Sequence, residues 1–235
     1  MLQRLDTDGW NFSVYRSVYP PVSSNMYIII ADKEAIVVDS NISGGVYELL
    51  SERGVQKVHL FLSHEHYDHS YGVCWFQKHF DTTLYAHSQC RNMLSTDKAS
   101  SPRLVAFILS AMDMNDGGHR YEDFKNEMTQ YSLSPDIFFE DKEKYDVAGY
   151  SIEIIHTPGH TPGSCLFIMD GKFLFSGDTI IMGNKVITGF KGGNKEELMD
   201  ITLPKLKALP TELTVLPGHG DPFKIKDYNF DIYNV

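Results

Sequence analysis

Cysteine is scarce in this 235-residue sequence, and its few copies follow no paired motif. The three cysteines are Cys74, Cys90 and Cys165, so their number is odd and no C-x-x-C spacing occurs. A secreted fold held by disulfides usually has an even set at regular spacings, so we expect free thiols in a reducing compartment. We interpret all three as small buried hydrophobic residues.

Long apolar runs are also missing, and the start of the sequence does not have the pattern of a secretory signal. The first ten residues are polar and acidic, whereas such a signal needs a basic end followed by an apolar stretch. No run approaches the roughly 20 apolar residues that span a bilayer. We therefore expect a cytoplasmic protein without a membrane partner.

Positive charge is in deficit, because 21 lysines and arginines stand against 31 aspartates and glutamates, a formal net charge of −10. Binding to a phosphate backbone depends on Lys and Arg, so we expect a small-molecule substrate and no nucleic-acid partner. The other proportions, 42% hydrophobic and 22% charged residues, are those of a globular protein. At this length we expect a single domain over residues 1–235.

Strand and helix patterns alternate in two parts of the sequence, which indicates the α/β class. In the first part, strands are predicted at residues 12–18, 26–31, 35–39 and 58–62, with a helix at 46–53. In the second part, strands at 150–155, 164–169 and 172–176 precede a helix at 195–209 and a strand at 213–216. The helix-then-strand unit thus occurs twice, once on each side of a central insertion.

The central insertion is predicted to be helical. Strand signals vanish from residue 88 to about 146, and helical patterns cover 89–94, 102–114 and 120–130. The middle pattern is apolar nearly all round, because Val105 and Leu109 add to its apolar stripe. It therefore packs deeply, contacts another subunit or lines an apolar substrate pocket. A homo-oligomer would form through this insertion or through the C-terminal tail, residues 223–235, which otherwise adds an edge strand.

The densest chemical signal lies directly after the apolar strand at 58–62 and reads His64-Glu65-His66-Tyr67-Asp68-His69. It holds four metal-ligand side chains in six residues. In an extended segment His64 and His66 point to the same side, and neutral imidazole with carboxylate suits zinc and, less selectively, iron or manganese. A surface loop rich in histidine by chance is the alternative, because the chain has ten histidines.

Three later turns each present one more ligand after a predicted strand. They contain His160 in a Pro-Gly-His turn, Asp178 after a glycine, and His219 in a second Pro-Gly-His turn. Glycine and proline make the sharp turns that aim a side chain inward. Together with the first motif they supply five histidines and two aspartates, enough for two ions with an open position for water.

In this order the motifs resemble the metallo-β-lactamase fold superfamily of hydrolases, over residues 24–222. The resemblance implies a four-layer αβ/βα sandwich with the helical insertion over an active-site cleft. Aspartate at position 178 makes the ligand set similar to that of glyoxalase II. The family pattern implies that His64, His66 and His160 hold a first metal, that Asp68, His69 and His219 hold a second, and that Asp178 bridges both.

Asp39 matches an acidic position of the family that orients ligands from outside the metal shell. An aspartate in a turn explains the same residue equally well. Tyr67 and Tyr71 flank the histidine motif, where they either contact substrate or pack between helices.

The resemblance implies a hydrolase with two divalent ions, zinc first and iron or manganese as alternatives. A metal-bound hydroxide would attack an ester, thioester or lactone of a small molecule, and Asp68 would carry a proton to the leaving group. One alternative is a mononuclear iron oxidoreductase of the persulfide dioxygenase type, and another is a phosphodiesterase. A binding module without catalysis is a further class, but it has no physical need for all seven ligands.

Overall fold

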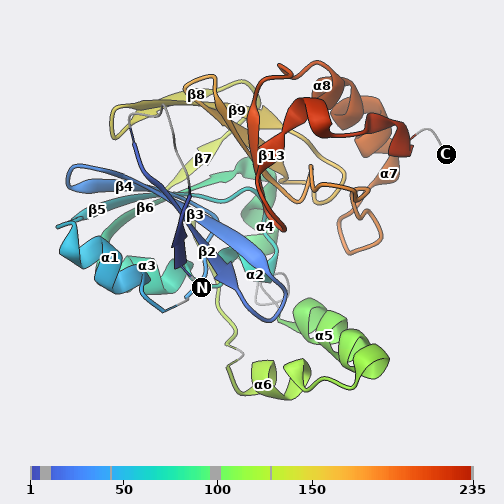
Figure 1. The fold of residues 1–235 in the computed structure, drawn as a ribbon, viewed down its shortest axis with the longest axis horizontal. Coiled ribbons are helices and arrows are strands. Elements are labelled where there is room, and N and C mark those ends of the chain that lie inside the picture. The colour runs from blue at the N-terminus through green and yellow to red at the C-terminus, as the bar shows by residue number, and fades with distance from the viewer. Residues whose placement is uncertain (1, 6–11, 43, 96–101, 128, 234–235) are drawn as a thin grey trace.

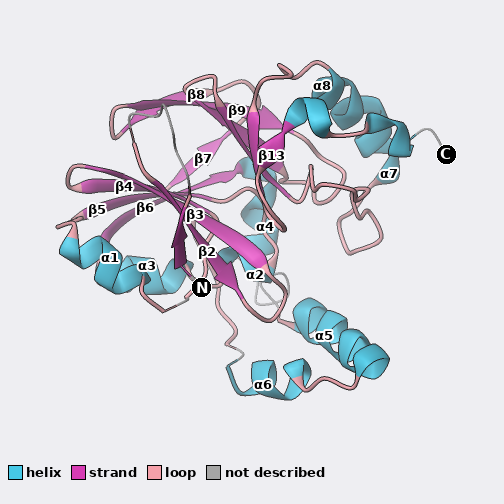
Figure 2. Cartoon of the chain, viewed as in Figure 1, coloured by secondary structure: helices cyan, strands magenta, loops and turns pink. Residues whose placement is uncertain are grey.

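The computed structural model describes residues 2–5, 12–42, 44–95, 102–127 and 129–233. Two β-sheets stack face to face, and helices cover the outer face of each (Figure 1). Figure 2 shows the strands in the middle and the helices outside, which is the four-layer αβ/βα sandwich expected from the motifs. None of the described helices has the length and apolar character required to cross a bilayer.

The first sheet contains seven strands in sequence order. Neighbouring strands among the first four are antiparallel, and neighbouring strands from the fourth to the seventh are parallel. The strands are β1 (Leu2–Arg4), β2 (Val14–Tyr19), β3 (Ser24–Ala31), β4 (Glu34–Val38), β5 (Lys57–Phe61), β6 (Asp81–His87) and β7 (Ile137–Phe139).

The second sheet contains six strands in the order β13-β12-β11-β10-β9-β8. Only β11 and β12 pair parallel, and the other neighbours are antiparallel. The strands are β8 (Lys144–Val147), β9 (Tyr150–His156), β10 (Cys165–Met169), β11 (Phe173–Gly177), β12 (Thr214–Pro217) and β13 (Phe223–Lys224).

Helices connect the parallel strands and cover the outer layers. On the first sheet these are α1 (Val46–Glu52) and α3 (Val73–His79), and on the second α7 (Lys195–Glu197), the π-helical turn η2 (Leu198–Thr202) and α8 (Leu203–Lys207) (Figure 1). Shorter elements are α2 (Tyr67–Ser70), η1 (Ser88–Cys90), α4 (Arg91–Leu94), η3 (Ile225–Asp227) and η4 (Phe230–Tyr233).

Three hydrophobic cores separate these four layers. Strand β4 shows why the strands read as continuous apolar runs, because Val37 packs toward the helical layer while Ile36 and Val38 pack between the sheets. The core between the sheets is rich in aromatic side chains. The rings of Phe61 and Tyr85 stack there, with their centroids 4.2 Å apart. The third core lies between the second sheet and its helices. Burial on both faces therefore fixes the register of the central strands.

The insertion contains α5 (Arg103–Asp116) and α6 (Arg120–Glu127), which project from the sandwich (Figure 1). The expectation that strand signals vanish from 88 to about 146 is wrong at two places, because β7 and β8 lie inside that range. β7 has only three residues, and β8 is a sheet-edge strand in which Lys144 and Asp146 are exposed. Neither offers the long apolar run of a central strand.

The C-terminal tail packs on its own chain. It adds the two-residue edge strand β13, and it buries Tyr228 and Tyr233 in the core of the second sheet. The edge-strand interpretation of this segment is therefore confirmed.

Candidate metal centre

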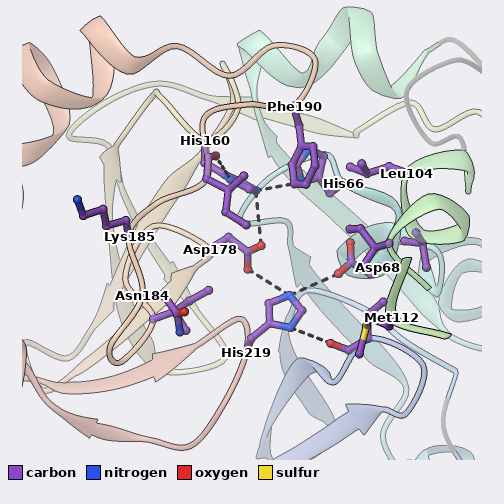
Figure 3. A pocket seen from close by; sticks show the side chains of 15 residues that line it. His66, Asp68, Leu104, Met112, His160, Asp178, Asn184, Lys185, Phe190 and His219 are labelled. Carbon is purple, nitrogen blue, oxygen red and sulfur yellow. Dashed lines mark hydrogen bonds and ion pairs between the residues drawn. The ribbon is translucent and has the colours of Figure 1, made fainter. Parts of the chain in front are cut away.

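All seven predicted ligands lie at the carboxyl ends of strands. His64 and His66 follow β5, and the short helix α2 then carries Asp68 and His69. The other three come from the second sheet, where His160 follows β9, Asp178 follows β11 and His219 follows β12. Strand ends of stacked sheets meet at one edge, which is how segments about 150 residues apart in sequence come together (Figure 3).

The seven side chains form three overlapping groups in which the ligand atoms lie within 4.8 Å of one another. Two groups share His64, and two share His69. The groups are His64, His66 and His160; His64, His69 and Asp178; and Asp68, His69 and His219.

The donor atoms fit metal ions. His64 Nε2, His69 Nε2 and Asp178 Oδ1 are buried and have no hydrogen-bond partner among the described residues. Buried polar atoms without partners are costly, so such a cluster needs a cation to complete it. Imidazole nitrogens with carboxylate oxygens are the ligand set of zinc and of non-haem iron.

Backbone and side-chain acceptors orient the imidazoles. His160 Nδ1 lies 2.7 Å from the carbonyl oxygen of Ile187, and His219 Nδ1 lies 3.1 Å from that of Val22. Each ring therefore donates its Nδ1–H outward and presents Nε2 to the centre. This arrangement, in which the second nitrogen fixes the tautomer, is common for metal-bound histidine.

Asp39 performs the same function for His69. Its Oδ2 lies 2.9 Å from His69 Nδ1 and accepts a hydrogen bond of 2.8 Å from the Ser63 hydroxyl, while its Oδ1 accepts one of 2.8 Å from the Ser63 backbone N–H. Ser63 Oγ lies 3.0 Å from His64 Nδ1. Ser63 was not anticipated from the sequence, although its place directly before the first ligand was a usable signal. The backbone carbonyls that orient His160 and His219 leave no side-chain signal at all.

Burial and charge set the protonation states of the ligands. Burial, then the neighbouring His160, lowers the pKa of His66 to about 3, and burial lowers that of His64 well below 6.5. For His69 burial also acts downward, but the carboxylates of Asp68 and Asp178 hold its pKa well above 6.5. A metal that binds His69 must therefore displace a proton.

Tyr67 and Tyr71 are not brought to the centre. Tyr67 is buried, and its ring stacks on those of Tyr71 and Tyr131. The centroid distances are 5.6 Å to Tyr71 and 5.5 Å to Tyr131. The Tyr71 hydroxyl accepts a hydrogen bond of 2.8 Å from the backbone N–H of Ile42. These rings pack between α2, α5 and neighbouring loops, which fits the packing interpretation, and a substrate contact stays a prediction.

A cavity of about 280 Å³ opens beside the ligands (Figure 3). Five of the seven ligands line it: His66, Asp68, His160, Asp178 and His219. Helix α5 forms one wall, and residues 181–190 form another. The helical insertion therefore lies over the centre, as expected.

Comparison with known proteins agrees with this geometry. A probable metallo-hydrolase of Bacillus subtilis, YqgX, is 26% identical over 202 residues, 85% of this chain and 86% of that protein. The hydroxyacylglutathione hydrolase GloC of Haemophilus influenzae is also 26% identical over 202 residues, 80% of this chain and 81% of that protein. The crystal structure of the B3 metallo-beta-lactamase BLEG-1 shares the fold, with a TM-score of 0.69 at 24% identity, over 91% of this chain and 95% of that one.

The family model described as the metallo-beta-lactamase superfamily matches residues 19–219, a range that contains both sheets' ligand turns and all seven candidate ligands. Fold, ligand order and family match lead to the same conclusion. The chain belongs to the metallo-beta-lactamase superfamily.

Proposed function

We propose that the chain is a hydrolase that holds two divalent metal ions, zinc in the first instance, and cleaves an ester, thioester or lactone bond of a small molecule. The position of Asp178 carries the proposal. Its Oδ2 lies 3.5 Å from His160 Nε2, and its Oδ1 lies 3.5 Å from His219 Nε2. One carboxylate oxygen thus faces each of the two outer groups, which is the arrangement that a bridging ligand requires (Figure 3).

The remaining ligand roles belong to the same proposal. His64, His66 and His160 would hold one ion, and Asp68, His69 and His219 the other. When bound, the ions would polarise a carbonyl oxygen and lower the pKa of water.

Asp68 lines the cavity and is suited to carry a proton. Burial would raise its pKa, but the charge of His69 lowers it to about 2, so the carboxylate is ionised at neutral pH. In that state it accepts a proton and can pass it to a leaving group. The names of YqgX, a probable metallo-hydrolase, and of GloC, a hydroxyacylglutathione hydrolase, support hydrolysis and make thioesters the first substrates to test.

The test is a turnover panel of thioesters, lactones, esters and phosphodiesters with zinc, manganese and iron forms of the protein. Asp178→Asn should lose bound metal and turnover together. Asp200→Asn is the matched control, because Asp200 is exposed on the helical layer of the second sheet. Absence of carboxylic and thioester cleavage at full metal occupancy would reject the proposal.

A mononuclear iron oxidoreductase is the second candidate. Two of the three ligand groups consist of two histidines and one carboxylate, His64 with His69 and Asp178, and His69 with His219 and Asp68. This combination is typical of non-haem iron oxygenases. Metal analysis with an oxygen electrode separates the two candidates, because one iron per chain with oxygen consumption would support the oxidoreductase.

A further inference from the structure

The cavity beside the ligands is lined mainly by large apolar side chains. Helix α5 presents Leu104, Ile108 and Met112 to it, spaced four residues apart along one line of the helix. The opposite wall contributes Ile187 and Phe190, with further apolar side chains on each side. The cavity volume of about 280 Å³ lies at the lower end of ligand pockets, so it fits a small group.

Helix α5 has a second apolar line in a buried core, and its Val105 also borders the cavity. Val105 and Leu109 are 2% and 0% exposed and pack in a core with Tyr19, Tyr67 and Phe124. The side chains that line the cavity are more exposed to solvent. Met112 on α5 is 40% exposed, and Ile187 on the opposite wall is 54% exposed. The core line therefore anchors the helix, and the cavity line leaves apolar surface that a bound molecule can remove from water.

Few polar side chains outside the ligand set line this cavity. Among the described residues that line it, Lys185 and Asn184 are the polar ones outside the ligand set. Figure 3 shows the Lys185 side chain pointing away from the ligands. Along Leu104, Ile108 and Met112 an anionic substrate tail would meet no cationic side chain of the lining, so its burial there would be costly.

We propose that this cavity binds an uncharged, apolar acyl group, so that the substrates of the hydrolase are acyl esters, thioesters or lactones whose acyl part lies along Leu104, Ile108 and Met112. The carbonyl end would lie at the ligands and the chain would extend along α5. The bond that is cleaved rests on the proposed function, whereas the apolar binding site rests on the cavity alone.

The binding test uses straight-chain alkanoates, butyrate to octanoate, titrated by calorimetry into the zinc-loaded protein. Each methylene that enters the cavity should raise affinity about fourfold. Adipate is the matched control for hexanoate, because it has the same number of carbons and a second carboxylate. We expect adipate to bind at least about tenfold more weakly, since its far carboxylate would be buried without a cation. Affinity that does not change with chain length, or adipate binding as well as hexanoate, would overturn the proposal.

Matched variants on α5 locate the site. Met112→Gln makes the cavity line polar with little change in size, and Ile108→Thr makes it polar with the loss of one side-chain heavy atom. Both should flatten the dependence on chain length. Phe107→Gln is the control on the same helix, because Phe107 is 69% exposed and lies outside the cavity. Circular dichroism checks that α5 is intact in each variant. An equal effect of Phe107→Gln would place the apolar contact elsewhere and reject the assignment.

The outcome also separates this proposal from the hydrolase itself. Length-dependent alkanoate binding without turnover of any acyl substrate would keep the cavity assignment and reject hydrolysis. Turnover with no dependence on acyl length, in the intact protein and in Met112→Gln alike, would keep hydrolysis and reject the cavity assignment.

Discussion

Replacing Asp39 with asparagine tests whether a buried carboxylate outside the ligand set controls metal affinity. Asp39 is 2% exposed and has a left-handed backbone, with φ of 59°. Asparagine keeps the size of the side chain and tolerates this backbone conformation. Its amide group, however, puts N–H donors where Oδ2 now accepts from Ser63 Oγ and faces His69 Nδ1.

The expected loss follows from what His69 does in the centre. His69 belongs to two of the three ligand groups, and the Asp39 carboxylate fixes its Nδ1–H so that Nε2 faces inward. Loss of such an outer partner typically weakens metal binding 10- to 100-fold, about 1.4–2.8 kcal/mol. The ion held with Asp68 and His219 should be lost first, because His64, His66 and His160 form a group without His69.

Competition with a coloured chelator would measure the affinities of the two proposed zinc sites separately. Asp32→Asn is the control, because Asp32 also has a left-handed backbone, with φ of 53°, but is exposed in the turn after β3. Only Asp39→Asn should weaken zinc binding. Two unchanged zinc affinities in Asp39→Asn would refute the reasoning, and equal losses in both variants would attribute the effect to the backbone.

Three further predictions concern stability, each measured by denaturant unfolding. Burial lowers the pKa of His87 from 6.5 to about 4, so the unfolded state takes up a proton at this residue first as pH falls. This residue should lower the free energy of unfolding by up to about 3 kcal/mol from pH 6.5 to 4, and His87→Gln should remove that part of the dependence. Leu109→Ala, at a fully buried position, should cost about 2–5 kcal/mol, while Met114→Ala, at an 86% exposed position on the same helix, should change stability by less than about 0.5 kcal/mol. Gly163→Ala would bring Cβ into overlap with Cys90 Sγ and within 2.9 Å of Glu65 Oε2, and it should cost about 1–3 kcal/mol. Cys90→Ala in the same chain should restore part of this loss, and no recovery would mean that the overlap with Cys90 Sγ is not the cause.

The sequence predicts the fold well because its strongest patterns have direct physical causes. Continuous apolar strands such as 58–62 are buried on both faces, and ligand side chains follow strands at turns that only glycine and proline form readily. β8 was missed because half of an edge strand faces water, so Lys144 and Asp146 interrupt the apolar signal.

The environment of the centre is harder to predict, because partners far apart in sequence decide it. The hydroxyl of Tyr71 accepts a hydrogen bond from the N–H of Ile42, 29 residues away, a contact that its place beside the histidine motif does not predict. The two explanations of Asp39 differ only in whether His69, 30 residues later, folds back onto it. Which side chains of α5 pack in a core and which line the cavity also depends on contacts with distant segments, and no local pattern encodes these contacts.

The division of the ligands between the two sheets has a consequence for the lifetime of the folded chain. Each of the three groups takes two residues from segments of the first sheet and one from the second, His160, Asp178 or His219. An ion in any group therefore cross-links the two sheets of the sandwich. A metal that binds only the folded chain adds about 2.7 kcal/mol to the free energy of unfolding at a free concentration of 100 times its Kd. Metal starvation should thus expose the protein to unfolding and proteolysis at the same moment that it removes activity, so the amount of folded protein would follow the free metal level.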